Sequence, residues 1–507
     1  MLSMKYFLTF IFKDEELKKF IFLFLLTWQF SAFAVFAQNT AQKIDKLMQQ
    51  YFEYGEFNGY VLISQCGKVI FQKGYGYANI EQKIPNTSDT KFYIGSITKA
   101  FTDLMILQMA EKGKIRLDAK ISDYLPDYPK PNGDSITIYN LLTQTSGIPD
   151  YDGDPRIDVD WTKHYSSQEI LALFDSLPLL FKLGTRFSYT NSTAYICGVI
   201  MEKLTGKSYG DLLKENILSP LQMDNTAYTE FTPTNNKFAI GYEMSGKKPV
   251  ASPYYNNTSA YSAFGIYSTA EDMQKWNEAL NAEKLLSKKF MNIYFRPYKE
   301  NWACDWVIAK NPFHKAGDTT VAAIRGGTFG QFECWDVNFI KEKNSIVLMG
   351  NARSSRMEEI QKNITAILFN KPYMAPKRSL QKIFVEIADK KGLVNASTEV
   401  LYKAKDTSTY YISAGEFLHI GFAYKYQKKD LKSAICVFEL IAKLFPETYN
   451  AYDSEFFTDT SNVYGILGET YIQDGQKEKA IEALKKAVAL NPDDQRSVGL
   501  LHKIEKQ

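Results

Sequence analysis

The stretch 95–99, Gly-Ser-Ile-Thr-Lys, places the strongest constraint on how this chain folds. We expect Gly95 to end a loop and Ser96 to open a helix that ends near Gly113. Ser96 and Lys99 then lie one turn apart on the same helix face, so the ammonium can reach the hydroxyl. Free N–H groups at the helix start add partial positive charge where an oxyanion would form. The stretch therefore predicts a serine acyl-transfer site that needs no histidine.

The Ser-x-x-Lys pattern also occurs at Ser245–Lys248 and at Ser379–Lys382. The first copy lies in a polar segment and the second follows a proline-containing linker, so neither shares the surroundings of Ser96. The alternative role for Ser96 is a helix N-cap, in which its hydroxyl accepts a backbone hydrogen bond. The context of Ser96 favours the catalytic interpretation.

At 507 residues the chain exceeds the usual size of one domain, and two domains are expected. Its hydrophobic and charged fractions, 45% and 23%, are ordinary for a globular protein. A formal net charge of +3 without a basic run argues against a nucleic-acid partner.

Residues 1–37 have the composition of a secretory signal peptide. Lys18-Lys19 precedes an apolar run over residues 20–36, and small residues stand before the expected cut at Ala37. We therefore predict export to the periplasm or the extracellular space. A retained membrane anchor is the alternative, because the stretch before Lys18 is long for a signal peptide.

The five cysteines and four histidines are scattered, and none has metal-ligand spacing. We expect no metal and no cofactor, and buried free thiols are favoured over a disulfide formed after export. The scarcity of histidine favours chemistry in which lysine and tyrosine move the proton.

Two alternating apolar runs, 59–64 and 68–73, flank a glycine-containing turn and predict a β-hairpin. Further strands are expected at 320–325, 331–340 and 345–351, and helices dominate the region between. This order predicts an α+β domain over residues 38–370, whose antiparallel sheet joins the N-terminal hairpin to the C-terminal strands. Residues 371–378 have the composition of a linker.

The remaining residues, 379–507, are predicted to be entirely helical. Gly468, Tyr471, Ala480 and their neighbours fit a tetratricopeptide frame, which an earlier stretch from Ile420 to Pro446 repeats. The helix pair 380–391 and 395–405 is a further, degenerate unit. A generic helical bundle is the alternative. A repeat domain of this kind predicts a protein or peptide partner.

A serine nucleophile also needs a base, an oxyanion hole and groups that hold the substrate. Tyr189-Thr190-Asn191 follows a break between predicted helices, and a tyrosine flanked by cations can act as the base. The same Tyr-x-Asn pattern occurs at residues 77–79, 254–256 and 255–257. Residues 325–328, Arg-Gly-Gly-Thr, stand at a strand end, where the glycines let a substrate approach the sheet edge.

Taken in order, these motifs resemble the serine β-lactamase and penicillin-binding-protein family. The branch is that of class C β-lactamases, D-alanyl-D-alanine carboxypeptidases, D-aminopeptidases and related esterases. The resemblance spans residues 44–368 and implies a β-lactamase/transpeptidase-like antiparallel sheet flanked by helices. It rests on six segments: 95–102, 141–149, 187–191, 219–223, 267–272 and 326–328.

The resemblance implies a role for each motif. Ser96 is the acylated nucleophile, Lys99 lowers its proton affinity, and Tyr189 exchanges the proton with Ser96 and the leaving group. Asn191 positions the Lys99–Tyr189 pair. The oxyanion hole and the substrate-binding edge are implied for the backbone N–H groups of Ser96 and Thr328, with Arg325, Gly326 and Gly327 beside them.

Two residues depart from the family pattern. Arg325 stands where the family has lysine or histidine; it keeps the positive charge but cannot shuttle a proton. We therefore predict that Arg325 binds a carboxylate of the substrate. Gln144 replaces a histidine, a change that we expect to lie behind the groups that touch substrate.

These observations predict an exported serine hydrolase that cleaves amide, lactam or ester bonds through an acyl-enzyme. Its substrate would be a small peptide, a lactam or an ester, and the sequence does not choose among them. The alternative is a catalytically weak penicillin-binding-type protein that acts as a peptide or cell-wall binding module. A plain repeat scaffold is disfavoured, because so much of the chain carries site motifs.

Overall fold

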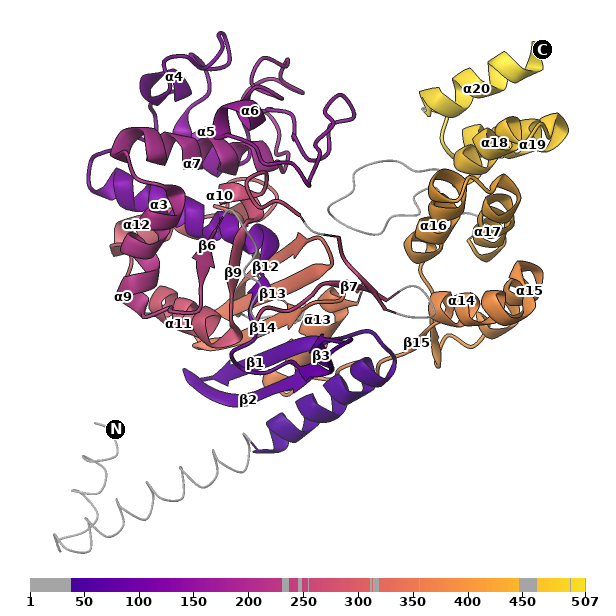
Figure 1. Cartoon of the computed structure of the whole chain (residues 1–507), viewed down its shortest axis with the longest axis horizontal. Helices are drawn as coiled ribbons and strands as arrows, with labels where there is room; N and C mark the ends of the chain where they lie inside the picture. Colours follow the sequence, from indigo (N-terminus) through magenta and orange to yellow (C-terminus); the bar gives the residue numbers. More distant parts are fainter. Residues whose placement is uncertain are drawn as a thin grey trace, which may run out of the picture. The chain divides into compact units, whose positions relative to one another are not determined.

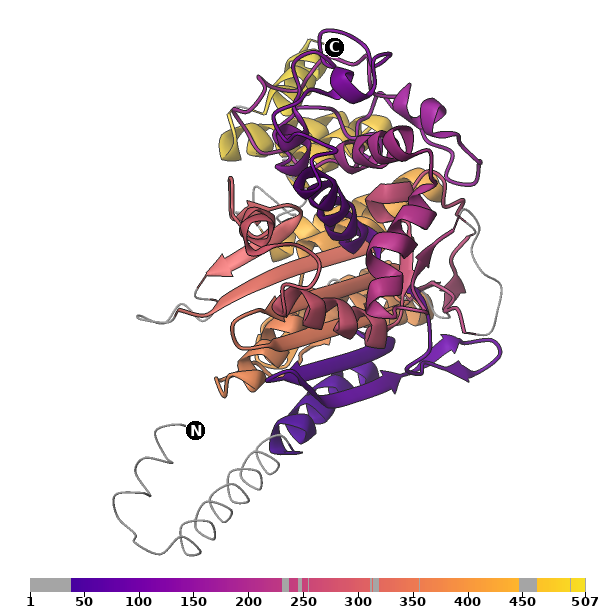
Figure 2. The ribbon, with the colours of Figure 1, turned by 90° about the vertical axis from the view of Figure 1, so that its left-hand side faces the viewer.

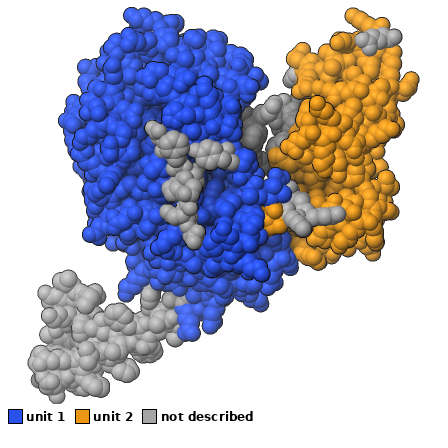
Figure 3. Space-filling model, viewed as in Figure 1, with its two compact units in different colours: residues 1–243, 250–374 blue, residues 244–249, 375–507 orange. Residues whose placement is uncertain are grey.

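A computed structural model describes residues 38–506 except 230–236, 245–248, 254, 311, 313–318, 355, 446–462 and 493. The predicted signal segment, the Ser245–Lys248 motif copy, Tyr254 and Pro446 lie outside the described residues. The chain divides into two compact units, residues 1–243 with 250–374 and residues 244–249 with 375–507 (Figures 1 and 3). The division after residue 374 falls inside the predicted linker.

A seven-stranded antiparallel sheet forms the centre of the first unit. Strands from the two ends of the unit meet in it, because β1 pairs with β14 so that Tyr60 lies opposite Met349. The predicted joining of the N-terminal hairpin to the C-terminal strands is thereby confirmed. Figure 2 shows the strands side by side, with β1 and β2 at one edge. In spatial order they are β10 (Trp302–Ala303), β11 (Trp306–Lys310), β12 (Val321–Phe329), β13 (Phe332–Phe339), β14 (Asn344–Gly350), β1 (Gly59–Gln65) and β2 (Lys68–Tyr75).

Both faces of this sheet are covered, as the alternation of side chains along β1 shows. Tyr60 and Leu62 pack into a core that β1 shares with the helices of one face. Val61 and Ile63 pack into a second core, shared with residues 38–53, which are helical, and with α13 (Met357–Leu368). The first unit is therefore a helix–sheet–helix sandwich.

Helices dominate the region between the two groups of strands, as predicted. The chief ones are α3 (Thr98–Glu111) and α7 (Asn191–Thr205). The Thr190 hydroxyl caps α7, and Gly206 ends it at a φ of 68°. The others are α4 (Ile121–Tyr124), α5 (Ile138–Leu142), α6 (Ser167–Leu171), α8 (Tyr209–Leu213), a π-helical turn η2 (Lys214–Leu218), α9 (Ser219–Leu221), α10 (Tyr261–Phe264), α11 (Ala270–Asn281) and α12 (Lys288–Tyr294).

Short strands complete the first unit in three small sheets. They pair β3 (Tyr77–Asn79) with β4 (Ile84–Pro85), β9 (Ile266–Ser268) with both β5 (Phe92–Tyr93) and β6 (Ala227–Tyr228), and β7 (Tyr242–Glu243) with β8 (Val250–Ala251). All five cysteines of the chain are free, and Cys66 alone among them is exposed.

The second unit is almost entirely helical and has its own apolar core. Gly421 lies against Phe438, and Gly468 lies against Leu484, so glycine permits the close approach of paired helices that the repeat pattern predicted. Its elements are β15 (Arg378–Ser379), α14 (Leu380–Lys391), α15 (Leu393–Lys403), β16 (Tyr410–Tyr411), α16 (Ala414–Phe422), η3 (Ala423–Gln427), α17 (Leu431–Leu444), α18 (Val463–Gln473), α19 (Lys477–Leu490) and α20 (Gln495–Glu505). Within the described ranges no helix combines the length and apolarity needed to cross a membrane.

Candidate active site

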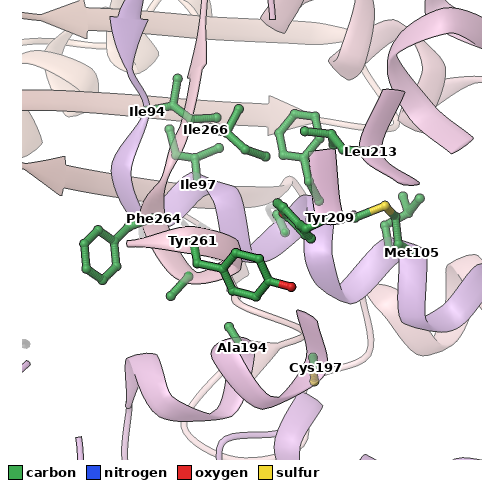
Figure 4. Close-up of a cluster of buried hydrophobic side chains, with 14 of the residues drawn as sticks. Ile94, Ile97, Met105, Ala194, Cys197, Tyr209, Leu213, Tyr261, Phe264 and Ile266 are labelled. Carbon is green, nitrogen blue, oxygen red and sulfur yellow. The ribbon is translucent and has the colours of Figure 1, made fainter. Parts of the chain in front are cut away.

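Ser96 lies in a single 3₁₀ turn, η1 (Gly95–Ile97), that leads directly into α3. Gly95 takes a φ of 55°, which glycine adopts without strain. Ile94 and Ile97 on either side are buried in the main core, beside Ile266 and Tyr261 (Figure 4). The α-helix begins two residues later than predicted, but the turn still places Ser96 at its start.

Lys99 points back at Ser96, as the three-residue spacing predicts. Its Nζ donates to Ser96 Oγ at 3.0 Å and to the Ala263 carbonyl at 2.9 Å, and the side chain is fully buried. The Ser379–Lys382 copy is different: the Ser379 hydroxyl accepts a hydrogen bond from the Lys382 backbone N–H and caps α14. The helix N-cap role, which was the alternative considered for Ser96, therefore belongs to Ser379.

Tyr189 is the tyrosine that meets the predicted nucleophile. Its hydroxyl donates to Ser96 Oγ at 2.7 Å. Two cations lie near its ring. Lys99 Nζ is 5.0 Å from the ring centroid, and Arg325 Cζ is 5.1 Å from it. The Tyr255–Asn257 copy has a structural role instead, since the Asn257 amide donates to the backbone oxygen of Gly265 at 2.8 Å.

The strand β12 presses against the turn that carries Ser96. A Cβ placed on Gly327 would lie 2.1 Å from the Ile94 oxygen and 2.6 Å from the Ser96 nitrogen. A Cβ on Gly95 would lie 2.4 Å from the Thr328 nitrogen. Only glycine fits at either position, and the contact brings the backbone of Thr328 against that of the predicted nucleophile.

Arg325 is buried and already partnered, which argues against its predicted role of binding a substrate carboxylate. Its side chain is 1% exposed and forms an ion pair with Asp305 at 3.2 Å. Its Nη2 donates to the Tyr189 hydroxyl at 2.8 Å, and its Nε donates to the Ser96 carbonyl at 3.2 Å. The guanidinium therefore serves residues of the site itself.

Asn191, predicted to position the Lys99–Tyr189 pair, forms side-chain hydrogen bonds to two carboxyls of a nearby loop. Its amide nitrogen donates to Asp150 Oδ2 at 3.1 Å and to Asp152 Oδ2 at 3.4 Å, which engages both of its hydrogens. Burial raises the pKa of Asp150, while the charge of Lys99 acts in the opposite direction. That Asn191 positions the Lys99–Tyr189 pair stays a prediction.

Two acidic residues near the site, Asp305 and Asp103, were not predicted to belong to it, whereas Gln144 was expected behind it. Asp305 sits at the tip of the β10–β11 hairpin, where Cys304 and Asp305 take φ values of 42° and 62°. The hairpin was missed because its turn has neither glycine nor asparagine, although aspartate between two apolar runs is a weak turn signal. Asp103 lies one turn after Lys99 on α3. Gln144 is buried and donates to Asp305 Oδ2 at 3.3 Å.

A cavity of about 280 Å³ lies beside the β10–β11 hairpin and does not include the predicted nucleophile. It is lined by Leu117, Tyr139, Leu142, Thr143, Ile293, Arg296 and Cys304. Across the part of the chain that the structure describes, no group of three histidine, cysteine or acidic side chains could hold a metal ion.

Comparisons with known proteins find two families in the chain. The profile of the β-lactamase family matches residues 40–386, and that of the tetratricopeptide repeat matches residues 461–494. The chain is 31% identical over 349 residues to Protein flp of Staphylococcus aureus (strain N315), which covers 66% of this chain and 67% of that protein.

Solved structures share the fold of the first unit. A penicillin-binding protein from Bacillus halodurans has a TM-score of 0.55 at 26% identity, covering 64% of this chain and 98% of that chain. The D-amino acid amidase from Ochrobactrum anthropi SV3, complexed with D-phenylalanine, also has a TM-score of 0.55, at 21% identity, over 66% of this chain and 99% of that chain. The predicted fold, an antiparallel sheet flanked by helices and followed by helical repeats, is confirmed.

The contact between β12 and the Ser96 turn predicts that Gly327→Ala will cripple the site. The added methyl must move the Ser96 nitrogen, and a displacement of this kind can lower kcat/KM on a small ester about 100-fold. Gly326→Ala is the matched control, because the three atoms nearest to its Cβ all belong to the Trp335 side chain, the first at 3.1 Å, and none to the Ser96 turn. Equal kcat/KM values for the two variants would show that the close approach is irrelevant to activity.

Proposed function

The chain belongs to the β-lactamase family, and from that membership we propose that it is an exported serine hydrolase that forms an acyl-enzyme. The bond it cleaves is an amide, a lactam or an ester. Its signal-like first 37 residues support export. A second, helical unit carries a tetratricopeptide repeat.

One observation carries the proposal: two proton-transfer groups converge on a single serine oxygen. Lys99 Nζ lies 3.0 Å and the Tyr189 hydroxyl 2.7 Å from Ser96 Oγ. Both distances lie within the range that a base needs to take a proton from a nucleophile. Neither the Ser379 copy nor the Tyr255 copy has such a neighbourhood.

Acylation then follows from the positions of these groups. For Tyr189 to act as the base it must first release its own proton, since the hydroxyl that donates to Ser96 Oγ cannot also accept from it. As Ser96 Oγ attacks the acyl carbon, the serine proton then passes to the Tyr189 phenolate oxygen, and Lys99 stabilises the charge that develops between them. The acyl oxygen becomes an oxyanion, for which we propose the N–H groups of Ser96 and Thr328 as donors; one such donor contributes about 3 kcal/mol. Tyr189 returns the proton to the leaving group, and water later releases the acyl group by the reverse path.

Ser96→Ala should abolish both turnover and covalent labelling while the protein stays folded. The measurement is mass spectrometry of the protein after treatment with a fluorophosphonate or a penicillin probe, with the adduct mapped to its peptide. Ser379→Ala is the control and should label as fully as the unaltered chain, because Ser379 is a helix cap.

The same labelling experiment separates the competing functions. Labelling without turnover would support the alternative, a catalytically weak penicillin-binding-type module. An adduct on any serine other than Ser96 would show that the nucleophile is wrongly assigned.

Tyr189→Phe should lower kcat about 100-fold or more, the usual scale for a general base, and should change KM much less. Tyr255→Phe is the matched control, because Tyr255 belongs to the competing Tyr-x-Asn copy and its ring packs on Phe329 at 5.6 Å. A large loss in the Tyr255 variant and a small one in the Tyr189 variant would reverse the assignment.

We propose that the second unit contributes binding of a protein or peptide partner and leaves the chemistry to the first. Leu380 and Phe384 of α14 already belong to the second core, although the family match extends to residue 386. All the residues proposed for acyl transfer lie before residue 329. The units should therefore be separable at about residue 374.

A chain that covers residues 38–374 should keep its kcat/KM on small esters within about threefold, because it retains the whole proposed site. The control is the full chain with the signal segment removed. Soluble, folded 38–374 protein that fails to label at Ser96 would show that the repeats complete the active site, and the division of labour would be wrong.

A further inference from the structure

The two departures from the family pattern, Arg325 and Gln144, meet at one residue. Asp305 forms an ion pair with Arg325 at 3.2 Å and accepts a hydrogen bond from Gln144 Nε2 at 3.3 Å. We infer that Asp305 is a positioning residue that acts through Arg325 on Tyr189. Its effect on catalysis rests on the function proposed above, whereas its effect on Tyr189 itself does not.

The contacts form a closed ring that includes the backbone beside Tyr189. Asp305 holds Arg325, and Arg325 Nη2 donates to the Tyr189 hydroxyl at 2.8 Å. Thr190, the next residue, donates its N–H to Gln144 Oε1 at 3.1 Å and accepts from Gln144 Nε2 at 3.3 Å. Gln144 closes the ring, because its Nε2 also donates to Asp305. One carboxylate thus fixes both the hydroxyl end of Tyr189 and its main chain.

Burial makes this carboxylate necessary. Arg325 and Asp305 are 1% and 2% exposed, and a guanidinium removed from water is strongly destabilising without a counter-ion. The Tyr189 and Trp302 rings lie 5.1 Å and 5.3 Å from Arg325 Cζ, but they offer only weak cation–π attraction. Asp305 therefore sets the plane in which the guanidinium fork presents its N–H groups.

Asp103 completes the arrangement from α3. Asp103 Oδ2 and Asp305 Oδ1 are both buried, and neither accepts a conventional hydrogen bond from the described residues. Burial, together with the charge of Asp305, holds the pKa of Asp103 well above its usual range. A single proton on Asp103, donated to Asp305, satisfies both oxygens.

The β10–β11 turn that carries Asp305 has a strained backbone. Both turn residues, Cys304 and Asp305, adopt left-handed backbone conformations that glycine would take without strain. The strain is tolerated because the turn delivers Asp305 into the buried site. A turn at the protein surface has no need of a strained backbone or a buried carboxylate. We therefore infer that this turn is shaped to place Asp305 beside Arg325.

The test is Asp305→Asn, which keeps the shape of the side chain and removes its charge. On p-nitrophenyl acetate we expect kcat to fall about tenfold or more and KM to stay within about threefold, because Tyr189 is displaced but substrate contacts remain. The active fraction is counted by fluorophosphonate labelling, so a simple loss of folded protein does not lower the measured kcat. The fold loss should be the same on p-nitrophenyl hydrogen succinate, which carries a carboxylate.

Asp336→Asn is the matched control. Asp336 lies opposite Arg325 in the strand register, but its carboxylate is bonded to the Asn277 amide at 2.6 Å. Its kcat should equal that of the unaltered chain. An unchanged kcat in Asp305→Asn, or an equal loss in both variants, would overturn the inference.

A double-mutant cycle tests whether Asp305 acts through Arg325. Adding Asp305→Asn to Arg325→Met should lower kcat no further than Arg325→Met alone, because the guanidinium that Asp305 orients is gone. Additive losses would show that Asp305 works by another route. If Asp305→Asn does not fold, Gln144→Met opens the same ring at a second point and should lower kcat without raising KM.

A last measurement does not depend on turnover. In Ser96→Ala protein labelled with ¹³C at the tyrosine Cζ, the Tyr189 resonance is identified by its loss in Tyr189→Phe. It should shift in Asp305→Asn and stay in place in Asp336→Asn. An unmoved resonance would refute the positioning role even if the protein hydrolyses esters. A shift in a chain that never acylates Ser96 would instead show that only the proposed function is wrong.

Discussion

The site depends on one close contact between backbones, where β12 lies against the 3₁₀ turn at Ser96. Gly95 and Gly327 make the contact possible, since a Cβ on either would overlap the opposite chain. The buried side chains of Ile94 and Ile97 anchor the turn in the core, so the turn cannot move away from β12. Once the turn is fixed to the sheet, the start of α3 is fixed too, and the direction of Lys99 follows from the helix.

The second constraint is electrostatic, because two cations are buried within about 5 Å of the Tyr189 ring. The Lys99 ammonium donates hydrogen bonds to a backbone carbonyl and to the serine hydroxyl. Arg325 is instead paired with a counter-ion, the carboxylate of Asp305. That pairing changes what the third motif can do. Because Asp305 already neutralises its charge, the Arg325 guanidinium attracts a substrate anion only weakly. It can still hold the Tyr189 hydroxyl in place by a hydrogen bond. We therefore propose that groups other than Arg325 recognise the substrate.

Much of this was predictable from the sequence because it is local. The spacing of Ser96 and Lys99, and the alternation in the β1–β2 hairpin, report directly on helix and strand geometry. The role of Arg325 was not predictable, since its partner comes from a hairpin whose Cys304–Asp305 turn lacks the usual residues. The end of β12 was placed four residues early for a related reason. Gly326 and Gly327 read as a strand end, yet contact with the Ser96 turn keeps them extended through Phe329.

Arginine in the third motif also limits how protons can move in the site. A guanidinium stays charged throughout the working range of pH, so it can donate hydrogen bonds but cannot carry a proton between serine and leaving group. Burial, together with the charge of Asp305, raises the pKa of Asp103 well above its usual range. Among the residues that the structure describes, Lys99 and Tyr189 are the side chains that hydrogen-bond Ser96 Oγ. The whole proton path of the proposed reaction therefore falls on this pair, and the buried acid–arginine cluster serves to keep the tyrosine where the path requires it.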